Sequence, residues 1–211
     1  MDIKVEKIKE LNEKFDNCRG NRIVQNAAMT NGVAQAATNK KIEGIERHSF
    51  SINLNQGEIT NQKQSGRCWM FAALNTFRYR IIKDLNLKNF ELSQSYPLFY
   101  DKLEKSNYFF NSILKTLDED LDGRLLAHLL SDPLGDGGQW DMFVNLVDKY
   151  GVVPKDVMPE SANSESTRFM DEYLTKLLRT YASKLRSSHE KGASMEELEE
   201  IIEKAAEVVL E

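Results

Sequence analysis

The fold is decided by one stretch of the chain, Thr60-Asn61-Gln62-Lys63-Gln64-Ser65-Gly66-Arg67-Cys68-Trp69-Met70-Phe71-Ala72-Ala73. From Cys68 onward, the segment 68–85 lacks glycine and proline, and it spaces Ala73, Phe77 and Ile81 four residues apart. This spacing places the apolar side chains on one face of a helix. The sequence therefore predicts a largely buried helix that begins at Cys68.

A cysteine at the start of a helix is placed for nucleophilic chemistry. Backbone N–H groups and the positive end of the helix dipole both favour the thiolate, which is the nucleophilic form of cysteine. Six residues earlier, the side-chain NH₂ of Gln62 can join the backbone N–H of Cys68 in stabilising an oxyanion, if the loop between them folds back. Gly66 keeps the approach to the sulfur uncrowded. We predict Cys68 as a nucleophile and Gln62 as part of an oxyanion hole.

These residues resemble the active-site block of the papain-like cysteine peptidases, where a Gln stands six positions before a Cys-Trp pair that opens the central helix. The matching residues are Gln62, Gly66, Cys68 and Trp69. Two positions depart from the papain pattern, because Ser65 replaces a cysteine and Arg67 replaces a small residue. The form Ser-Gly-Arg-Cys-Trp is similar to the cytoplasmic branch of the family, which comprises bleomycin hydrolase and bacterial aminopeptidase C.

Two further stretches support this branch, Glu91–Tyr96 and Asp136–Met142, the latter followed by Tyr150–Pro154. The resemblance implies that Gly137 and Gly138 lie along the cleft and pair with the backbone of a peptide substrate, with Trp69 in the same substrate-binding group. Only glycine lets another main chain approach so closely. A Gly-Gly pair by itself is more typical of a turn, so both interpretations stay open.

The activity implied by the resemblance is that of a cysteine aminopeptidase, which removes N-terminal residues from peptides through a thioester acyl-enzyme. We expect no cofactor. The resemblance implies a homo-oligomer, which in this family is a hexamer. The alternative comes from another functional class. On that hypothesis the chain is a non-catalytic helical module for binding or assembly that retains a relic of the active-site loop.

A papain-type nucleophile needs a histidine as base and an asparagine that orients it, with the histidine about 130–150 residues beyond the cysteine. The chain has no histidine between 198 and 211. His189 lies in a charged helix end and is predicted as a surface residue, His128 lies among leucines and is predicted in or beside the core, and His48 precedes Cys68. We therefore expect the chain to be the N-terminal part of a longer enzyme, with the catalytic His and Asn outside it.

The predicted fold class is mainly α, as the N-terminal helical half of a papain-like α+β fold with helical insertions. Expected domains are an N-terminal helix and irregular wrap at 1–57, the papain-like helical domain at 58–160, and a helical insertion, acidic at its end, at 161–211. The wrap should contain a short strand at 50–54. The expected helices are 3–15, 68–85, 95–105, 108–117, 124–130, 140–150, 169–186 and one that starts from a capping box at Ser194.

Two apolar stripes indicate helices, and the first of them is expected to face the core. One consists of Tyr96, Phe99, Tyr100 and Leu103, in the helix that Ser93 and Ser95 can cap. The other begins at Trp140 and continues through Phe143, Val144 and Val147.

Composition narrows the possible partners and location. The chain has 211 residues, of which 41% are hydrophobic and 29% charged, as in ordinary globular proteins. With 28 Lys and Arg against 33 Asp and Glu, its net charge is −5, so nucleic acid is not an expected partner. No apolar run approaches the roughly 18 residues of a membrane span, and residues 1–7 alternate in charge, unlike a signal peptide. We expect a cytoplasmic protein.

Two other features resemble metal or nucleophile sites without completing them. Asp118–Gly123 opens like a calcium-binding EF-hand loop, but Leu129 occupies the twelfth position, where a bidentate Glu is needed. We predict a turn between helices there. Cys18 has no positioned base or Gln nearby, and no Cys/His spacing resembles a zinc site. We predict that Cys18 is inert and that the chain binds no metal.

Overall fold

The computed structural model describes residues 3–43, 45, 50–54 and 56–210. The chain divides into two compact units, Met1–Asn53 and Leu54–Glu211. The division expected at 160/161 falls inside the second unit, and the separation into 58–160 and 161–211 stays a prediction.

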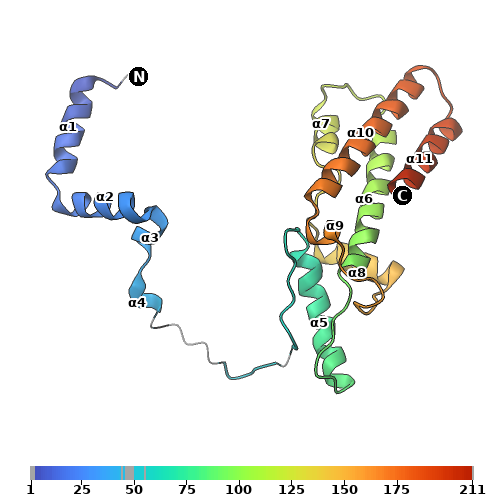
Figure 1. The fold of residues 1–211 in the computed structure, drawn as a ribbon. Coiled ribbons are helices and arrows are strands. Elements are labelled where there is room, and N and C mark those ends of the chain that lie inside the picture. The colour runs from blue at the N-terminus through green and yellow to red at the C-terminus, as the bar shows by residue number, and fades with distance from the viewer. Residues whose placement is uncertain (1–2, 44, 46–49, 55, 211) are drawn as a thin grey trace. The chain divides into compact units, whose positions relative to one another are not determined.

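The first unit is helical and carries no buried side chain among its described residues. Its helices are α1 (Val5–Asp16), α2 (Arg19–Asn31), α3 (Val33–Ala37) and α4 (Lys40–Glu43) (Figure 1). The helix expected at 3–15 is confirmed. The prediction of an irregular wrap is wrong for residues 19–43, which contain α2, α3 and α4. Alanines and glutamines there favour a helix without forming an apolar stripe. The strand expected at 50–54 is also wrong, because those residues form none, while His48 lies outside the described residues.

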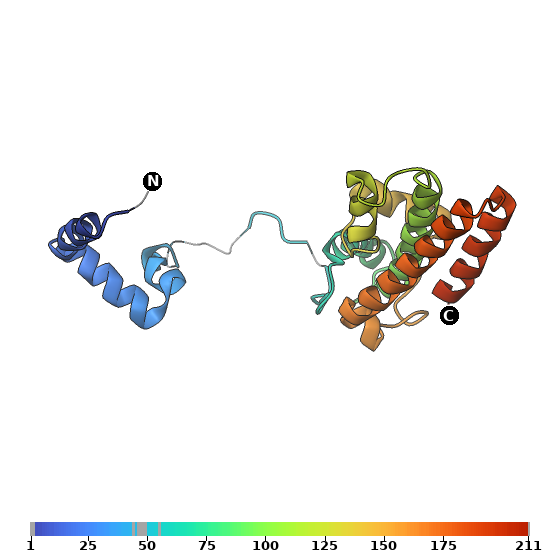
Figure 2. The same cartoon turned by 90° about the horizontal axis from the view of Figure 1, so that it is seen from above.

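The described residues of the second unit form seven helices. They are α5 (Cys68–Asp84), α6 (Ser95–Leu114), α7 (Arg124–Ser131), α8 (Trp140–Tyr150), α9 (Ala162–Glu165), α10 (Arg168–Glu190) and α11 (Met195–Leu210). Both views show α11 running alongside α10, and α6 packs against both (Figures 1 and 2). Among the described residues the only strand-like pairings are two isolated bridges, Gln64 with Ser166 and Leu92 with Pro154. The mainly α fold class is confirmed.

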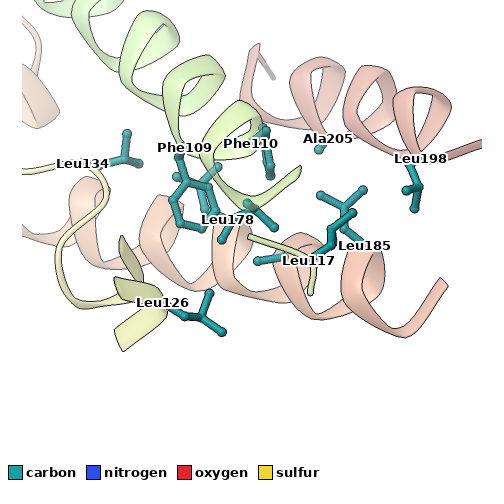
Figure 3. Packing of buried hydrophobic residues seen from close by; sticks show 11 residues of the cluster. Phe109, Phe110, Leu117, Leu126, Leu134, Leu178, Leu185, Leu198 and Ala205 are labelled. Carbon is teal, nitrogen blue, oxygen red and sulfur yellow. The ribbon is translucent and has the colours of Figure 1, made fainter. Parts of the chain in front are cut away.

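Two hydrophobic clusters hold this unit together. The larger cluster lies between α6, α7, α10 and α11 and includes Phe109, Phe110, Leu126, Leu178 and Leu198 (Figure 3). The smaller one joins α5, α6 and α8 and includes Met70, Leu74, Leu98, Phe143 and Leu146. Since α5 begins at Cys68, the smaller cluster fixes the helix that carries the candidate nucleophile.

Helix α6 differs from expectation in two ways. It is continuous, whereas we expected a break between 105 and 108, and at Ser106 the buried hydroxyl donates to the carbonyl of Lys102 at 2.7 Å. The stripe expected to face the core is wrong for Phe99, which is exposed, whereas half-buried Tyr100 packs against the smaller hydrophobic cluster. The buried face of α6 instead includes Ser95, Lys102 and Ser106. Because polar side chains interrupt this buried face, the spacing of apolar residues does not reveal it.

Smaller corrections concern exposed residues. Trp140 is 60% exposed, although the stripe that begins with it does bury Phe143. His128 is exposed rather than in the core, since the buried residue of α7 is Leu126 and residues two apart point to different sides of a helix. Helix α9, with a capping box from Ser161 and Ser164, was not expected.

Several turns and helix ends agree with the sequence. Residues 118–123 form turns, the capping box at Ser194 is present, and α8 ends before Gly151, which adopts a φ of +77°. Within the described residues no helix has both the length and the apolar character needed to cross a membrane.

Candidate active site

Cys68 is the first residue of α5, and its unpaired side chain is exposed. Buried Met70, Phe71 and Leu74 anchor the following turns of the helix. The N-cap residue, Arg67, supplies no side-chain cap, so the N–H groups of the first turn remain at the end where the sulfur lies. The predicted helix start is confirmed, and the catalytic role of Cys68 stays a prediction.

The segment that leads to Cys68, residues 60–67, is called the nucleophile loop. It folds back on itself, as the interpretation of Gln62 required. Gln62 Nε2 donates to the carbonyl of Ser65 at 2.9 Å, and Ser65 Oγ donates to the carbonyl of Gln62 at 2.7 Å. Outside the loop, the backbone N–H of Gln64 donates to the carbonyl of Glu165 at 2.9 Å. The loop is thereby tied to the segment that precedes α10.

The side chain of Asp136 connects this loop to two other parts of the unit. Its Oδ2 accepts the backbone N–H of Gly66 at 2.7 Å and the hydroxyl of Thr167 at 2.6 Å, while its Oδ1 lies 2.8 Å from Lys102 Nζ. A Cβ on Gly66 would come within 2.6 Å of the Asp136 Cβ. We expected Gly66 to keep the sulfur accessible, and the structure shows a different need for it, the close approach of Asp136.

Buried cations organise the glycine-rich loop 134–138. Lys102 Nζ donates to the carbonyl of Leu134 at 2.6 Å, and Lys105 Nζ donates to the carbonyls of Gly135 at 2.6 Å and Gly137 at 2.9 Å. The carbonyl between them, that of Asp136, accepts Trp69 Nε1 at 2.8 Å. Four consecutive carbonyls are therefore held by α5 and α6.

Trp69 links the nucleophile helix to the Gly-Gly pair. A Cβ on Gly138 would overlap the Cε2 and Cζ2 atoms of the indole, whereas a Cβ on Gly137 would meet no atom within 4 Å. Gly138 thus lies directly against the side chain that follows Cys68. The structure brings Trp69 and Gly138 together, and their role in substrate binding stays a prediction.

The two carboxylates around Lys102 have pKa values that are shifted in opposite directions. Burial tends to raise the pKa of Asp136, but hydrogen bonds from Lys102, Thr167 and the Gly66 N–H lower it well below its usual range. Burial, and to a smaller extent the charge of Asp136, together raise the pKa of Asp171 to about 6, against the attraction of Lys102. Asp171 Oδ1 lies 2.6 Å from Lys102 Nζ as an ion pair, yet its geometry is not that of a hydrogen bond.

Arg67 is fully buried beside the nucleophile. Its Nη1 lies 2.9 Å from Glu160 Oε1, and its Nε donates to Ser65 Oγ at 2.8 Å. Burial tends to raise the pKa of Glu160, but hydrogen bonds from Arg67 and Ser164 lower it on balance. The Glu160 carboxylate is therefore ionised at neutral pH.

Sequence reasoning missed the ionic residues of this site. Arg67 was visible only as a departure from the papain pattern, and Asp136 only as one residue of a motif. Lys102, Asp171 and Glu160 carried no signal, because charged residues at such positions ordinarily face solvent.

The structure also describes the other candidate residues. Cys18 is exposed and unpaired at the start of α2. His189, near the end of α10, is half-buried and has its Nε2 2.9 Å from Asp118 Oδ1, and His128 is exposed on α7. The part of the chain that the structure describes contains no group of three or more His, Cys, Asp or Glu able to hold a metal ion.

We predict that Gly138→Ala disturbs the site and Gly137→Ala does not. The added methyl at 138 must displace the Trp69 indole and break its hydrogen bond to Asp136, at a cost of about 1–3 kcal/mol in the free energy of unfolding. The methyl at 137 meets open space and should cost less than about 0.5 kcal/mol. Urea unfolding followed by Trp69 fluorescence measures both, in a Trp140→Phe background that leaves one tryptophan. Equal losses in the two variants would contradict the packing.

We predict that Asp171→Asn becomes more stabilising as pH rises. Because the pKa of Asp171 is about 6 when folded against an ordinary 3.8, the folded state binds more protons than the unfolded state between these values. The contribution of Asp171 to stability therefore falls as pH increases through this window. Asparagine cannot ionise, so the variant should gain roughly 2 kcal/mol relative to the parent between about pH 4 and pH 7. A difference in unfolding free energy that stays constant over this range would show that the pKa is not raised.

Comparison with known proteins places these features in a family. The model of the peptidase C1-like family matches residues 2–211. The chain is 48% identical to aminopeptidase C of Lactobacillus delbrueckii subsp. lactis over 177 residues, which cover 84% of this chain and 39% of that protein. It is 42% identical to bleomycin hydrolase of Gallus gallus over 180 residues, which cover 83% of this chain and 40% of that protein.

A solved structure is also similar to this chain. The crystal structure of PepW from Lactobacillus rhamnosis HN001 matches 99% of this chain and 47% of its own, with a TM-score of 0.95 and 42% identity. The chain thus spans less than half the length of these relatives. The exposed cysteine at the start of α5, the folded-back glutamine loop and the Gly-Gly segment belong to a chain that is a member of the peptidase C1-like family.

Proposed function

We propose that this chain carries the nucleophile half of a cysteine aminopeptidase active site. The observation that supports the proposal most directly is the exposed Cys68 at the uncapped start of a helix whose following turns are anchored by buried residues, with Gln62 in a loop that folds back before it. In the proposed reaction, the Cys68 thiolate attacks the carbonyl carbon of a peptide bond. Gln62 and the Cys68 N–H then stabilise the oxyanion.

We propose that the backbone of Gly138, with Gly137 beside it, pairs with the substrate backbone. Gly138 has no hydrogen-bond partner for its backbone among the described residues, whereas the four preceding carbonyls are occupied. A backbone with free donor and acceptor groups, held in place by its neighbours, suits pairing with an extended peptide. Collapse of the intermediate breaks the peptide C–N bond, so that the amine leaves with a proton from a histidine and the acyl group remains on Cys68 as a thioester. Water, activated by the same histidine, then hydrolyses the thioester and releases the Cys68 thiolate. We propose that this histidine and its asparagine come from outside the chain.

Assembly and compartment are further parts of the proposal. The apolar side chains of α1, which include Val5, Ile8, Leu11 and Phe15, are exposed. We propose that the first unit contributes to contacts in a homo-oligomer, which is a hexamer by family resemblance. Both cysteines are unpaired, which supports a reducing compartment such as the cytoplasm.

We predict that iodoacetamide at neutral pH modifies Cys68 at least about fivefold faster than Cys18. Both side chains are exposed and both lie at helix starts, so accessibility does not separate them. Helix α5 is anchored by buried residues, while α2 has none and its first turn is free to fray. Intact-mass kinetics of Cys18→Ser and Cys68→Ser give the two rates separately. Equal rates would favour a non-catalytic module with a relic loop.

We predict aminopeptidase activity once the missing half is supplied. The chain would be joined to the remaining C-terminal part of the Lactobacillus delbrueckii aminopeptidase C. This chimera should release arylamine from an aminoacyl arylamide but not from its N-acetylated form. The Cys68→Ala chimera is the control and should be inactive. Cleavage that survives in the control, or a folded chimera without cleavage, would contradict the assignment.

A further inference from the structure

We propose that Arg67 is a positioning residue, which holds Gln62 in place in the nucleophile loop through Ser65. The proposal deepens the proposed function and rests on it for the meaning of Gln62. Arg67 stands where the papain pattern has a small residue, and Ser65 stands where that pattern has a cysteine. The proposal therefore involves both positions at which this sequence departs from the papain pattern.

The burial of Arg67 is costly and its contacts are specific. The residue is 0% exposed, and its charge is compensated by the single carboxylate of Glu160, itself held by the hydroxyl of Ser164 at 2.5 Å. One nitrogen, Nη2, is buried without a hydrogen-bond partner among the described residues. A buried ion pair is seldom more stabilising than an apolar pair of the same size. Stability alone therefore does not explain an arginine here, and its remaining contacts indicate what it does.

A chain of hydrogen bonds connects Arg67 to Gln62. The hydroxyl of Ser65 has one proton, which it donates to the carbonyl of Gln62 at 2.7 Å. The same oxygen accepts the Nε–H of Arg67 at 2.8 Å. Because a guanidinium can only donate, the Ser65 proton cannot be directed at Arg67 and is available for the carbonyl of Gln62. The fixed Ser65 in turn presents its carbonyl to Gln62 Nε2 at 2.9 Å.

Arg67 also contacts the helix that carries Cys68. Its carbonyl accepts the backbone N–H of Phe71 at 3.0 Å, and its Cζ lies 5.2 Å from the centre of the Phe71 ring. Phe71 belongs to the first turns of α5. One buried residue thus contacts the Gln62 loop on one side and the Cys68 helix on the other.

Lysine cannot reproduce these contacts. The guanidinium presents Nη1 to Glu160 and Nε to Ser65 from different edges of one rigid plane. A lysine has a single ammonium at the end of a flexible chain. Arg67→Lys can therefore keep the charge pair with Glu160 while losing the contact with Ser65.

The test measures the side-chain amide of Gln62 by NMR in the 211-residue chain. Its Nε2 resonances are identified by their loss in Gln62→Glu. In the parent we expect an ordered side-chain amide, with an order parameter near that of a rigid backbone, ~0.85. In Ser65→Ala and Arg67→Lys it should fall to the flexible range, below ~0.6. Ser112→Ala, which removes a hydroxyl bonded within its own helix α6, is the matched control and should leave the value unchanged.

Ser65→Ala decides the result if Arg67→Lys does not fold, because it leaves the buried ion pair intact. A Gln62 amide that stays equally ordered in Ser65→Ala overturns the proposal, because the proposed path from Arg67 to Gln62 runs through the Ser65 hydroxyl. The alkylation rate of Cys68 tests the proposed function separately. Suppose that Cys68 is alkylated no faster than Cys18, while the order of the Gln62 amide still falls in Ser65→Ala. This result would reject the peptidase assignment and retain the positioning role of Arg67.

Discussion

The geometry of the site depends on the carboxylate of Asp136. The carboxylate accepts the N–H of Gly66, which lies two residues before the cysteine. It also contacts Thr167 at the start of α10 and Lys102 in α6. Its own backbone lies in the Gly-Gly loop, where its carbonyl accepts the indole N–H of Trp69. A single residue therefore connects the nucleophile loop with the Gly-Gly segment.

Charge removed from water gives this arrangement its rigidity. The side chains of Arg67 and Lys102 are almost wholly buried, and Lys105 is largely so. Each must keep its partners, because a buried charge without one is strongly destabilising. For Lys102 these partners include two carboxylates and a backbone carbonyl from different elements. The resulting contacts are directional, whereas the apolar clusters beneath them only require that volume be filled.

Much of the fold was predictable, because it follows from local spacing. The helix that begins at Cys68, the turn at 118–123 and the helix end at Gly151 each depend on residues close together in the sequence. Predictions failed where this local signal was weak or misleading. The polar segment 19–43 is helical without an apolar stripe, and α6 buries Lys102 and Ser106 on the face that packs against its neighbours.

The sequence by itself determined the family resemblance, the mainly helical class, and the positions of Gln62, Cys68 and the Gly-Gly pair within their motifs. Each of these is written in residues that are neighbours along the chain. Only the tertiary structure decided why Gly66 must be a glycine, which lysines hold the Gly-Gly loop, and where the charge of Arg67 is compensated. Asp136 is 70 residues from Gly66, and Glu160 is 93 residues from Arg67. Pairings at that separation exist only once packing has brought the elements together and removed the water that would otherwise satisfy them.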